Sequence, residues 1–305
     1  MVIGGYNDDG RLSDVEMIAP FQQTSHCVDP QDLPQKSEKM VGEVINTVPM
    51  VCGGYVDSSV YSNKCFGYDN NVWTSRIQLQ HPRGYAGSIL LPNASGTQWW
   101  VSGGWGDSSS LTTSEVLLNI NDDTFTMSST LPEKMLGHCL SKINSSHIFI
   151  AGNDYDDLRM AYIVKTSIEP FVFTKLPPML ETRYYAACAT ITNHSPTTTM
   201  LNGNTQLMVA GGGSSTSTTS ELYSLDAGIW KYGPVLPRGF ANGGYINTHS
   251  TYPMIMVAGY DEGNNDRSDV MAYDPTTNEF KFLPGKLQTP RYALAVIGME
   301  TEEEC

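Results

Sequence analysis

Short apolar stretches that end in glycine recur along the chain. Four steps end in a glycine pair: Val2-Ile3-Gly4-Gly5, Val51-Cys52-Gly53-Gly54, Val101-Ser102-Gly103-Gly104 and Val209-Ala210-Gly211-Gly212. Two weaker copies, Ile150-Ala151-Gly152-Asn153 and Val257-Ala258-Gly259-Tyr260, complete the series. The first glycines fall at positions 4, 53, 103, 152, 211 and 259, a period near fifty residues. A fixed period of this length predicts six copies of one structural unit.

Each unit predicts four short strands. An apolar strand ends in the glycines, a polar loop follows, and a third strand begins, as at Ser268-Asp269-Val270-Met271-Ala272-Tyr273. After a turn comes a fourth strand that carries an aromatic residue, at Trp73, Phe125, Phe171, Trp230 or Phe280. The next unit opens with a strand of small residues, as in Arg183-Tyr184-Tyr185-Ala186-Ala187-Cys188. Short strands with regularly spaced turns indicate an all-β fold.

The two ends of the chain supply complementary strands. The chain begins in a second strand, at Val2 to Gly5, and finishes with a first strand, at Tyr292 to Ile297. Together they complete one blade, which closes a ring and removes exposed sheet edges. Small residues suit strands that crowd around a central channel, and paired glycines permit a tight turn and the close approach of neighbouring blades. We therefore expect a closed ring of four-stranded antiparallel blades.

The residues Gly53-Gly54, Tyr68 and Trp73 form the most complete copy of a glycine pair followed by a spaced Tyr and Trp. In this feature the chain resembles the kelch family, and it is most similar to secreted invertebrate kelch proteins. The resemblance implies a single six-bladed kelch β-propeller domain over residues 1–305. The expected blades are 1–34 with 287–298, 40–79, 84–131, 137–176, 184–236 and 241–284.

Charge and composition narrow the expected partners. The chain has 18 Lys and Arg against 32 Asp and Glu, a net charge of −14 that would repel nucleic acid and anionic lipid alike. No apolar run approaches the roughly 18 residues needed for a membrane span. The amino terminus lacks the charged and apolar regions of a signal peptide, which fits either a mature or trimmed chain or a cytosolic protein.

The predicted ring has two different faces. With strands a to d counted from the inside outward, a–b and c–d loops lie on one face, and b–c and d–a loops on the other. Three Asn-X-Ser/Thr sequons in a–b loops are candidate glycosylation sites, at Asn93, Asn144 and Asn193. The b–c loops are acidic, with Asp8, Asp9, Asp57, Asp107, Asp154, Asp156, Asp157, Asp261, Glu262 and Asp266. These acids either form turns or attract a cationic partner or calcium, although none has the spacing of a dedicated calcium loop.

Four arginines lie where d–a loops enter the innermost strands, at Arg83, Arg183, Arg238 and Arg291. They are therefore expected at the mouth of the channel, on the acidic face. In kelch substrate adaptors the corresponding loops hold peptide ligands and their arginines bind acidic groups, so the resemblance makes this mouth the candidate binding site. The alternative is that each arginine links neighbouring loops. The adjacent Tyr85, Tyr185, Tyr292 and Phe240 are expected to pack rather than to bind.

The six cysteines show no CxxC spacing, which leaves a zinc site or a redox pair without support. Cys52 and Cys65 flank a hairpin centred on Ser58 and Ser59 and are expected to form a cross-strand disulfide. Cys139 and Cys188 lie in neighbouring innermost strands one position out of register, and are expected to be buried thiols.

Cys27 and Cys305 are candidates for a disulfide that fastens the composite blade. The short acidic tail before Cys305 can extend about 25 Å, enough to cross the intervening strands. The alternative is a free terminal thiol.

No catalytic machinery is recognisable. The six histidines show no paired ligand spacing, whereas the copper-radical galactose oxidases need two His ligands. Six-bladed sialic acid mutarotases need only an acid–base pair at the channel mouth, for which His138 with Glu133 or Glu181 is the nearest candidate. We therefore expect no catalytic residue, no metal and no cofactor.

The expected function is that of a secreted, extracellular and monomeric module that binds a protein or extracellular matrix partner through its b–c and d–a loops. Two alternatives stay open. One is a carbohydrate-active enzyme of the sialic acid mutarotase type, and the other is an intracellular kelch adaptor domain in the cytoplasm. The identity of the partner does not follow, because a fold-level resemblance says little about the ligand.

Overall fold

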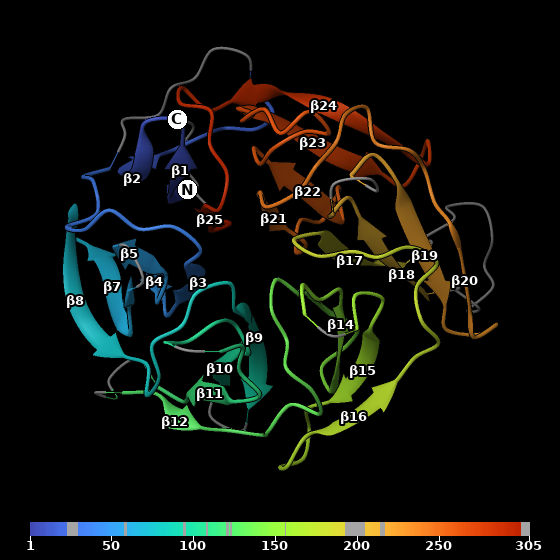
Figure 1. Ribbon diagram of the computed structural model, residues 1–305, viewed down its shortest axis with the longest axis horizontal. Coiled ribbons are helices and arrows are strands. Elements are labelled where there is room, and N and C mark those ends of the chain that lie inside the picture. The colour runs from blue at the N-terminus through green and yellow to red at the C-terminus, as the bar shows by residue number, and fades with distance from the viewer. Residues whose placement is uncertain are drawn as a thin grey trace.

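A computed structural model describes residues 1–22, 30–57, 60–93, 96–107, 109–119, 122, 124–155, 157–192, 205–213 and 217–299. These ranges contain strands, turns and loops but no helix. The sheets are arranged around a central axis as the blades of a propeller (Figure 1). The predicted all-β, six-bladed propeller is therefore confirmed. Cys27, Asp156, Asn193 and Cys305 lie outside the described residues.

Five blades are four-stranded antiparallel sheets. The second blade consists of β3 (Val41–Ile45), β4 (Val48–Cys52), β7 (Lys64–Asp69) and β8 (Val72–Gln78), with a small hairpin of β5 (Tyr55–Asp57) and β6 (Val60–Tyr61) between β4 and β7. The third consists of β9 (Gly87–Asn93), β10 (Gly96–Ser102), β11 (Ser114–Leu117) and β12 (Thr126–Met127). The fourth consists of β13 (Cys139–Lys142), β14 (His147–Ala151), β15 (Ala161–Lys165) and β16 (Val172–Lys175).

The fifth and sixth blades repeat this order. The fifth consists of β17 (Ala187–Thr192), β18 (Thr205–Ala210), β19 (Ser220–Ser224) and β20 (Ile229–Tyr232). The sixth consists of β21 (Gly244–Ile246), β22 (Met254–Val257), β23 (Asp269–Asp274) and β24 (Glu279–Lys286). In each of these five blades the first strand in sequence is innermost, so the chain runs outward through the blade and the d–a connection returns to the centre.

Both ends of the chain build the remaining blade. Strand β25 (Ala295–Val296) pairs with β1 (Val2–Asn7), which pairs in turn with β2 (Gly10–Glu16). Val2 lies opposite Val296, and the two termini lie close together in Figure 1. The described residues supply three strands of this blade. The predicted composite blade from both termini is confirmed.

A closed ring of backbone hydrogen bonds surrounds the channel. Each blade contributes one residue that lies just before its innermost strand: Lys39, Tyr85, Gly137, Tyr185, Asn242 and Ala293. The amide of each donates to the carbonyl oxygen of its equivalent in the preceding blade, over 2.6 to 3.2 Å. All six have a left-handed φ between 55° and 64°, although only one is glycine. Five of the six residues are not glycine and therefore carry the steric cost of a left-handed backbone. This cost indicates that the ring of hydrogen bonds determines how neighbouring blades meet.

The glycine pairs allow neighbouring chains to approach closely. A Cβ on Gly53, whose φ is 72°, would lie 2.4 Å from the carbonyl oxygen of Arg83. Gly211 stands in the same relation to Phe240, at 2.2 Å. The repeated glycines therefore mark the points where a b strand passes against an incoming d–a loop.

The hydrophobic core is divided among the interfaces between blades. Trp99 and Trp100 are adjacent on β10 and point to opposite faces, as successive strand residues do. Trp99 packs with Phe125 and Cys52 between the second and third blades, whereas Trp100 packs with Phe171 between the third and fourth. Both indoles are fully buried. Each sheet is thus apolar on both faces, and polar residues collect in the loops.

The described residues form two disulfides, one within a blade and one between blades. Cys52 and Cys65 face each other on β4 and β7, with 4.1 Å between their Cα atoms, and form the predicted bond. Cys139 and Cys188 also form a disulfide, across 5.7 Å between Cα atoms. The expectation of buried thiols at Cys139 and Cys188 is wrong, because β13 and β17 belong to adjacent blades and meet face to face, so sheet register does not limit them.

Candidate functional site at the channel mouth

The four arginines expected to bind ligands are buried. Arg83, Arg183, Arg238 and Arg291 are at most 7% exposed. Their guanidinium groups donate to backbone carbonyls deep in the loops, as from Arg183 to Gly211 and Thr219 at 2.7 and 3.0 Å. The observed contacts are those of the alternative, in which each arginine links neighbouring loops, and a binding role for the four arginines stays a prediction.

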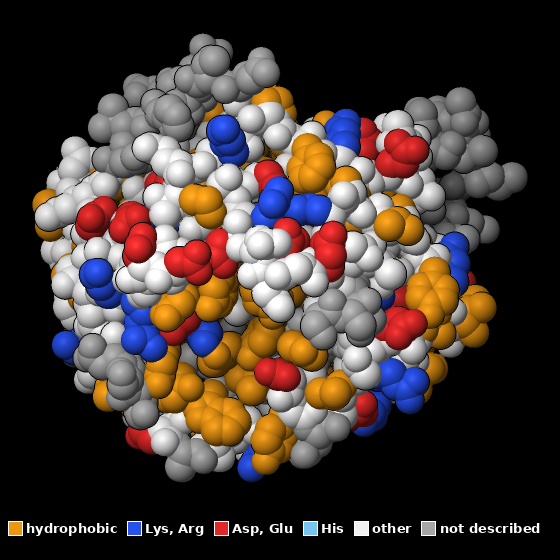
Figure 2. Space-filling view, turned by 45° about the horizontal axis from the view of Figure 1, so that its top comes forward, with side chains coloured by type: hydrophobic (Ala, Val, Ile, Leu, Met, Phe, Trp, Pro, Cys, Tyr) orange, Lys and Arg blue, Asp and Glu red, His pale blue; other side chains and the backbone are white. Residues whose placement is uncertain are grey.

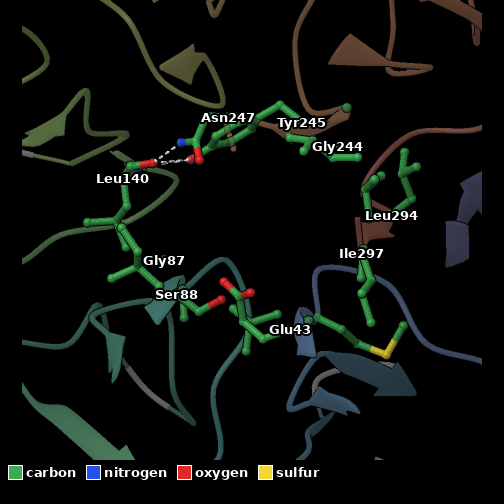
Figure 3. Close-up of a pocket in the computed structure, with 18 of the residues that line it drawn as sticks. Glu43, Gly87, Ser88, Leu140, Gly244, Tyr245, Asn247, Leu294 and Ile297 are labelled. Carbon is green, nitrogen blue, oxygen red and sulfur yellow. Dashed lines mark hydrogen bonds between the residues drawn. The ribbon is translucent and has the colours of Figure 1, made fainter. Parts of the chain in front are cut away.

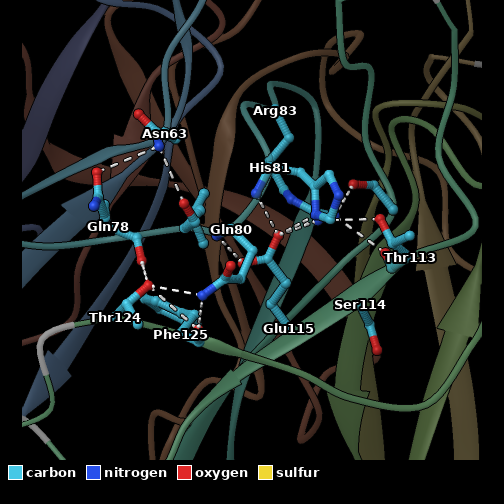
Figure 4. A network of polar contacts seen from close by, with 12 residues as sticks. Asn63, Gln78, Gln80, His81, Arg83, Thr113, Ser114, Glu115, Thr124 and Phe125 are labelled. Carbon is cyan, nitrogen blue, oxygen red and sulfur yellow. Dashed lines mark hydrogen bonds and ion pairs between the residues drawn. The ribbon is translucent and has the colours of Figure 1, made fainter.

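Acidic residues on third strands fix the arginines in place. Glu221 on β19 accepts from the Arg183 side chain at 2.9 Å and from the backbone amides of Leu180 and Glu181 at 2.7 and 3.0 Å. Glu115 repeats this arrangement with Arg83 and the amides of Gln80 and His81 (Figure 4). Glu16 does so with Arg291, and Asp269 pairs with Arg238.

Sequence reasoning missed these carboxylates. A signal was present, because the same triplet follows two of the glycine pairs, as Thr113-Ser114-Glu115 and Thr219-Ser220-Glu221. The same carboxylate holds both the arginine and the loop that carries it. Each arginine therefore stabilises one blade and its entering loop.

The nearest acid–base candidates do not meet. His138 is buried, its Nε2 lies 2.9 Å from the Ser102 hydroxyl, and burial lowers its pKa to about 4. The Tyr162 hydroxyl donates to Glu133 at 2.5 Å, and the Tyr232 hydroxyl donates to Glu181 at 2.6 Å. Each group is engaged in a separate contact.

Tyrosines, rather than arginines, surround the mouth. We call the following eight half-buried residues, which lie at the end of β1 or in the b–c and d–a connections, the tyrosine ring: Tyr6, Tyr55, Tyr61, Tyr85, Tyr184, Tyr185, Tyr260 and Tyr292. Tyr292 contacts both Tyr6 and Tyr260, with centroids 5.5 and 5.6 Å apart. Tyr185 contacts Tyr85 and Tyr184 at 5.3 and 5.4 Å.

Cations of the chain itself cover one side of the tyrosine ring. The Lys39 ammonium lies 3.9 Å from the centroid of Tyr85, and the Arg11 guanidinium lies 4.4 Å from that of Tyr55. Both cations pair with Glu38. The cations on the second-blade side of the mouth are thus already paired with a carboxylate of the chain.

The other side of the tyrosine ring has carboxylates without a cation. Asp154 accepts from the Tyr185 hydroxyl at 2.8 Å, and Asp266 bridges to Tyr260 through the backbone. Among the described residues neither carboxylate forms an ion pair. Burial raises the pKa of Asp154, and burial together with nearby Asp8 raises the pKa of Asp266. We call Asp154, Asp266 and the adjacent Tyr6, Tyr184, Tyr260 and Tyr292 the acidic arc.

The d–a connections face the viewer in Figure 1, and the same side is tilted into view in Figure 2. Acidic side chains there lie beside a depression lined by side chains of the hydrophobic class, in which Figure 2 includes Tyr. Exposed acids of the b–c loops include Asp8, Asp9, Asp107 and Glu262. On the opposite face, Asn144 is exposed between β13 and β14, and the backbone of Asn93 ends β9 at an a–b turn. Glycosylation at the sequons stays a prediction.

A cavity of about 330 Å³ lies in the channel among the innermost strands (Figure 3). Tyr245 and Asn247 on its wall are engaged, since both donate to the carbonyl oxygen of Leu140. Glu43 and Ser88 point into the cavity, and no described residue forms a hydrogen bond with either side chain (Figure 3). Burial raises the pKa of Glu43 to about 8, although Lys142 opposes the shift.

Glu43 gives the protein a pH-dependent stability. The folded protein keeps this carboxyl protonated up to about pH 8, whereas an unfolded chain ionises it near 4.5. Its contribution to stability is therefore fully present below pH 4.5 and is lost as the pH rises through 8. In Glu43→Gln this loss is absent, so we expect the variant's melting temperature to exceed that of the wild type by an amount that grows to about 5 °C between pH 5.5 and 8.5.

Thermal unfolding followed by circular dichroism across this range measures the gap. Glu279→Gln, at an exposed position on β24, is the matched control and should keep a constant gap. A gap for Glu43→Gln that does not change with pH would show that Glu43 titrates as a solvated carboxyl.

The described part of the chain contains no group of three or more His, Cys, Asp or Glu that could hold a metal ion. Within those same residues no helix has the length and apolar character to cross a membrane.

Comparison with known proteins bears on the fold. No protein-family model and no curated protein matches the chain. A solved structure described as "Structure of YjhT" superposes with a TM-score of 0.71, covering 92% of this chain and 96% of that chain at 12% sequence identity. The fold is that of a six-bladed β-propeller. At this identity the likeness concerns the fold alone.

Proposed function

We propose that the protein is a non-catalytic binding module whose acidic arc takes a cationic segment of a partner protein. The observation that carries this proposal is the pair of carboxylates, Asp154 and Asp266, that lie beside half-buried tyrosines without a cation. A lysine or arginine side chain of a partner supplies the missing charge. The proposed binding site thus lies on the b–c and d–a face.

Aromatic rings and carboxylates together favour a cation over other ligands. A guanidinium or ammonium over a tyrosine face gains about 0.5–2 kcal/mol, and more when it is desolvated. The chain already uses this contact, with Arg11 over Tyr55 and Lys39 over Tyr85. The net charge of −14 would also steer a basic partner toward the protein.

The contacts at the mouth support binding rather than catalysis. His138 is neutral and bound to Ser102, while Glu133 and Glu181 are tied to tyrosines. An enzyme needs an acid and a base within reach of one substrate atom. His138, Glu133 and Glu181 come nearest to this requirement, but each forms a hydrogen bond with a different partner.

An extracellular location is part of the proposal. The disulfides Cys52–Cys65 and Cys139–Cys188 support it, since such bonds persist in oxidising compartments. The exposed sequon at Asn144 fits the same location.

Selection of peptides from a random phage-displayed library tests the site. We expect enriched peptides to contain lysine or arginine, and their affinity to fall about tenfold in the double variant Asp154→Asn with Asp266→Asn. Tyr260→Leu, which keeps an apolar side chain but removes the ring, should weaken binding several-fold. Isothermal titration with the best synthetic peptide measures both effects.

The control Glu279→Gln removes one exposed charge from the outer strand β24 and should leave the affinity unchanged. Enrichment of acidic peptides, or equal affinity in the double variant and the control, would contradict the proposal.

A further inference from the structure

We propose that the central cavity is a binding site for a small alkylammonium ion, whose ammonium group pairs with Glu43 and whose hydrocarbon chain packs on the apolar inner strands. This site lies inside the channel and is separate from the acidic arc. It does not depend on what binds at the mouth.

The polar end of the site consists of Glu43 on β3 and Ser88 on β9. Both side chains point into the cavity and lie near each other (Figure 3). The other polar side chains that Figure 3 labels, Tyr245 and Asn247, are occupied by contacts to Leu140. An ammonium group has three donors and no acceptor, so a carboxylate and a hydroxyl oxygen suit it.

Glu43 is the one carboxylate among the described residues of the cavity wall, which Lys39 and Lys142 also line, and Lys39 already pairs with Glu38. No described Lys, Arg or His lies within ion-pair distance of Glu43, and Lys142 acts on it only at longer range. Above pH 8, where Glu43 is ionised, an anionic ligand would add a second negative charge to the same confined space. A cation instead neutralises the one carboxylate that faces the cavity.

The remaining wall selects a hydrocarbon. Leu90, Leu294 and Ile297 line the cavity together with backbone of the innermost strands. A volume of about 330 Å³ is at the lower end of the range for small-molecule sites. It accommodates a single short chain and excludes a folded segment of protein.

One end of the cavity is narrowed by side chains that bond to one another. The Lys39 ammonium donates to the Tyr85 hydroxyl, and the Tyr85 ring stacks on Tyr185 at 5.3 Å. All three residues line the cavity. A Cβ on Gly137 would lie 2.3 Å from the Tyr185 ring, so this ring lies directly over the fourth blade.

Binding should release a proton. The ammonium pairs with the ionised carboxylate, whereas burial keeps the pKa of Glu43 at about 8 in the free protein. Affinity should therefore rise with pH, approaching tenfold per pH unit well below 8, and level off above it while the amine stays protonated.

Titration of the full chain with n-hexylamine tests the proposal, with n-hexanol and hexanoate as matched probes. We expect hexylamine to bind with a dissociation constant of about 1 mM or tighter at pH 8.5. It should bind at least tenfold more tightly than the two other probes, and about 25-fold more weakly at pH 6.5. Isothermal titration in buffers of different ionisation enthalpy measures the released proton.

Two sets of variants locate the site. Glu43→Gln should weaken hexylamine binding at least tenfold, whereas the double variant Asp154→Asn with Asp266→Asn should not. The reverse pattern would place the amine at the mouth and overturn the cavity proposal while supporting the acidic arc. Equal binding of hexanol or hexanoate, or affinity independent of pH in the wild type, would overturn it without any variant.

Discussion

Replacing Glu221 with alanine is expected to destabilise the protein by about 3–5 kcal/mol and to lower its melting temperature by about 10 °C. The substitution leaves the fully buried Arg183 guanidinium without its counter-ion. It also leaves the backbone amides of Leu180 and Glu181 without their acceptor. Removing one partner of a buried pair costs more than the pair itself contributes, because the remaining charge stays out of water.

Differential scanning calorimetry of Glu221→Ala beside Glu279→Ala measures this effect. Glu279 is exposed on β24, so its loss should change stability by less than about 0.5 kcal/mol. A double variant, Arg183→Met with Glu221→Leu, should be more stable than Glu221→Ala, since it removes both charges together. Equal melting temperatures for Glu221→Ala and the control would contradict the buried ion pair.

Loss of the disulfide between the fourth and fifth blades is expected to have the second largest effect. Cys139 and Cys188 are 49 residues apart, and closing such a loop stabilises by about 4 kcal/mol on chain-entropy grounds. The 13-residue separation of Cys52 and Cys65 gives about 3 kcal/mol. We therefore expect Cys139→Ala with Cys188→Ala to melt about 8 °C below the wild type, and Cys52→Ala with Cys65→Ala to melt less far below it.

Thermal unfolding without reductant compares the two double variants, and non-reducing peptide mapping of the wild type shows which bonds exist. The first double variant should also lose most of its sensitivity to dithiothreitol. Free thiols at Cys139 and Cys188 in protein from an oxidising compartment would contradict the assignment. The same map tests the predicted Cys27–Cys305 bond.

The architecture could be predicted from sequence because it repeats. Six phased glycine steps define six units, and strands at both ends of the chain predict the composite blade. The bond between Cys52 and Cys65 was also within reach, since both residues lie on one hairpin. In each case the evidence is either a repeat or a pair of residues that lie close together in the chain, and both can be read directly from the sequence.

The site was harder to predict because it depends on contacts between distant segments. The arginines were expected at the loops where they lie, but their direction is set by carboxylates such as Glu115 and Glu221, more than thirty residues further along the chain. Cys139 and Cys188 meet across a blade interface, which strand register does not describe. The apolar wall around Glu43 comes from other blades, so nothing near Glu43 in the sequence indicates that it lines a cavity.

The proposal that the acidic arc is the binding face is tested most directly by hydrogen–deuterium exchange with mass spectrometry, in the presence and absence of the best selected basic peptide. We predict slower exchange in the segments that contain Asp154, Tyr184, Tyr260 and Asp266, and no change at the a–b turn that contains Asn144. Protection confined to that a–b turn or to the outer strands, with the acidic arc unchanged, would contradict the account.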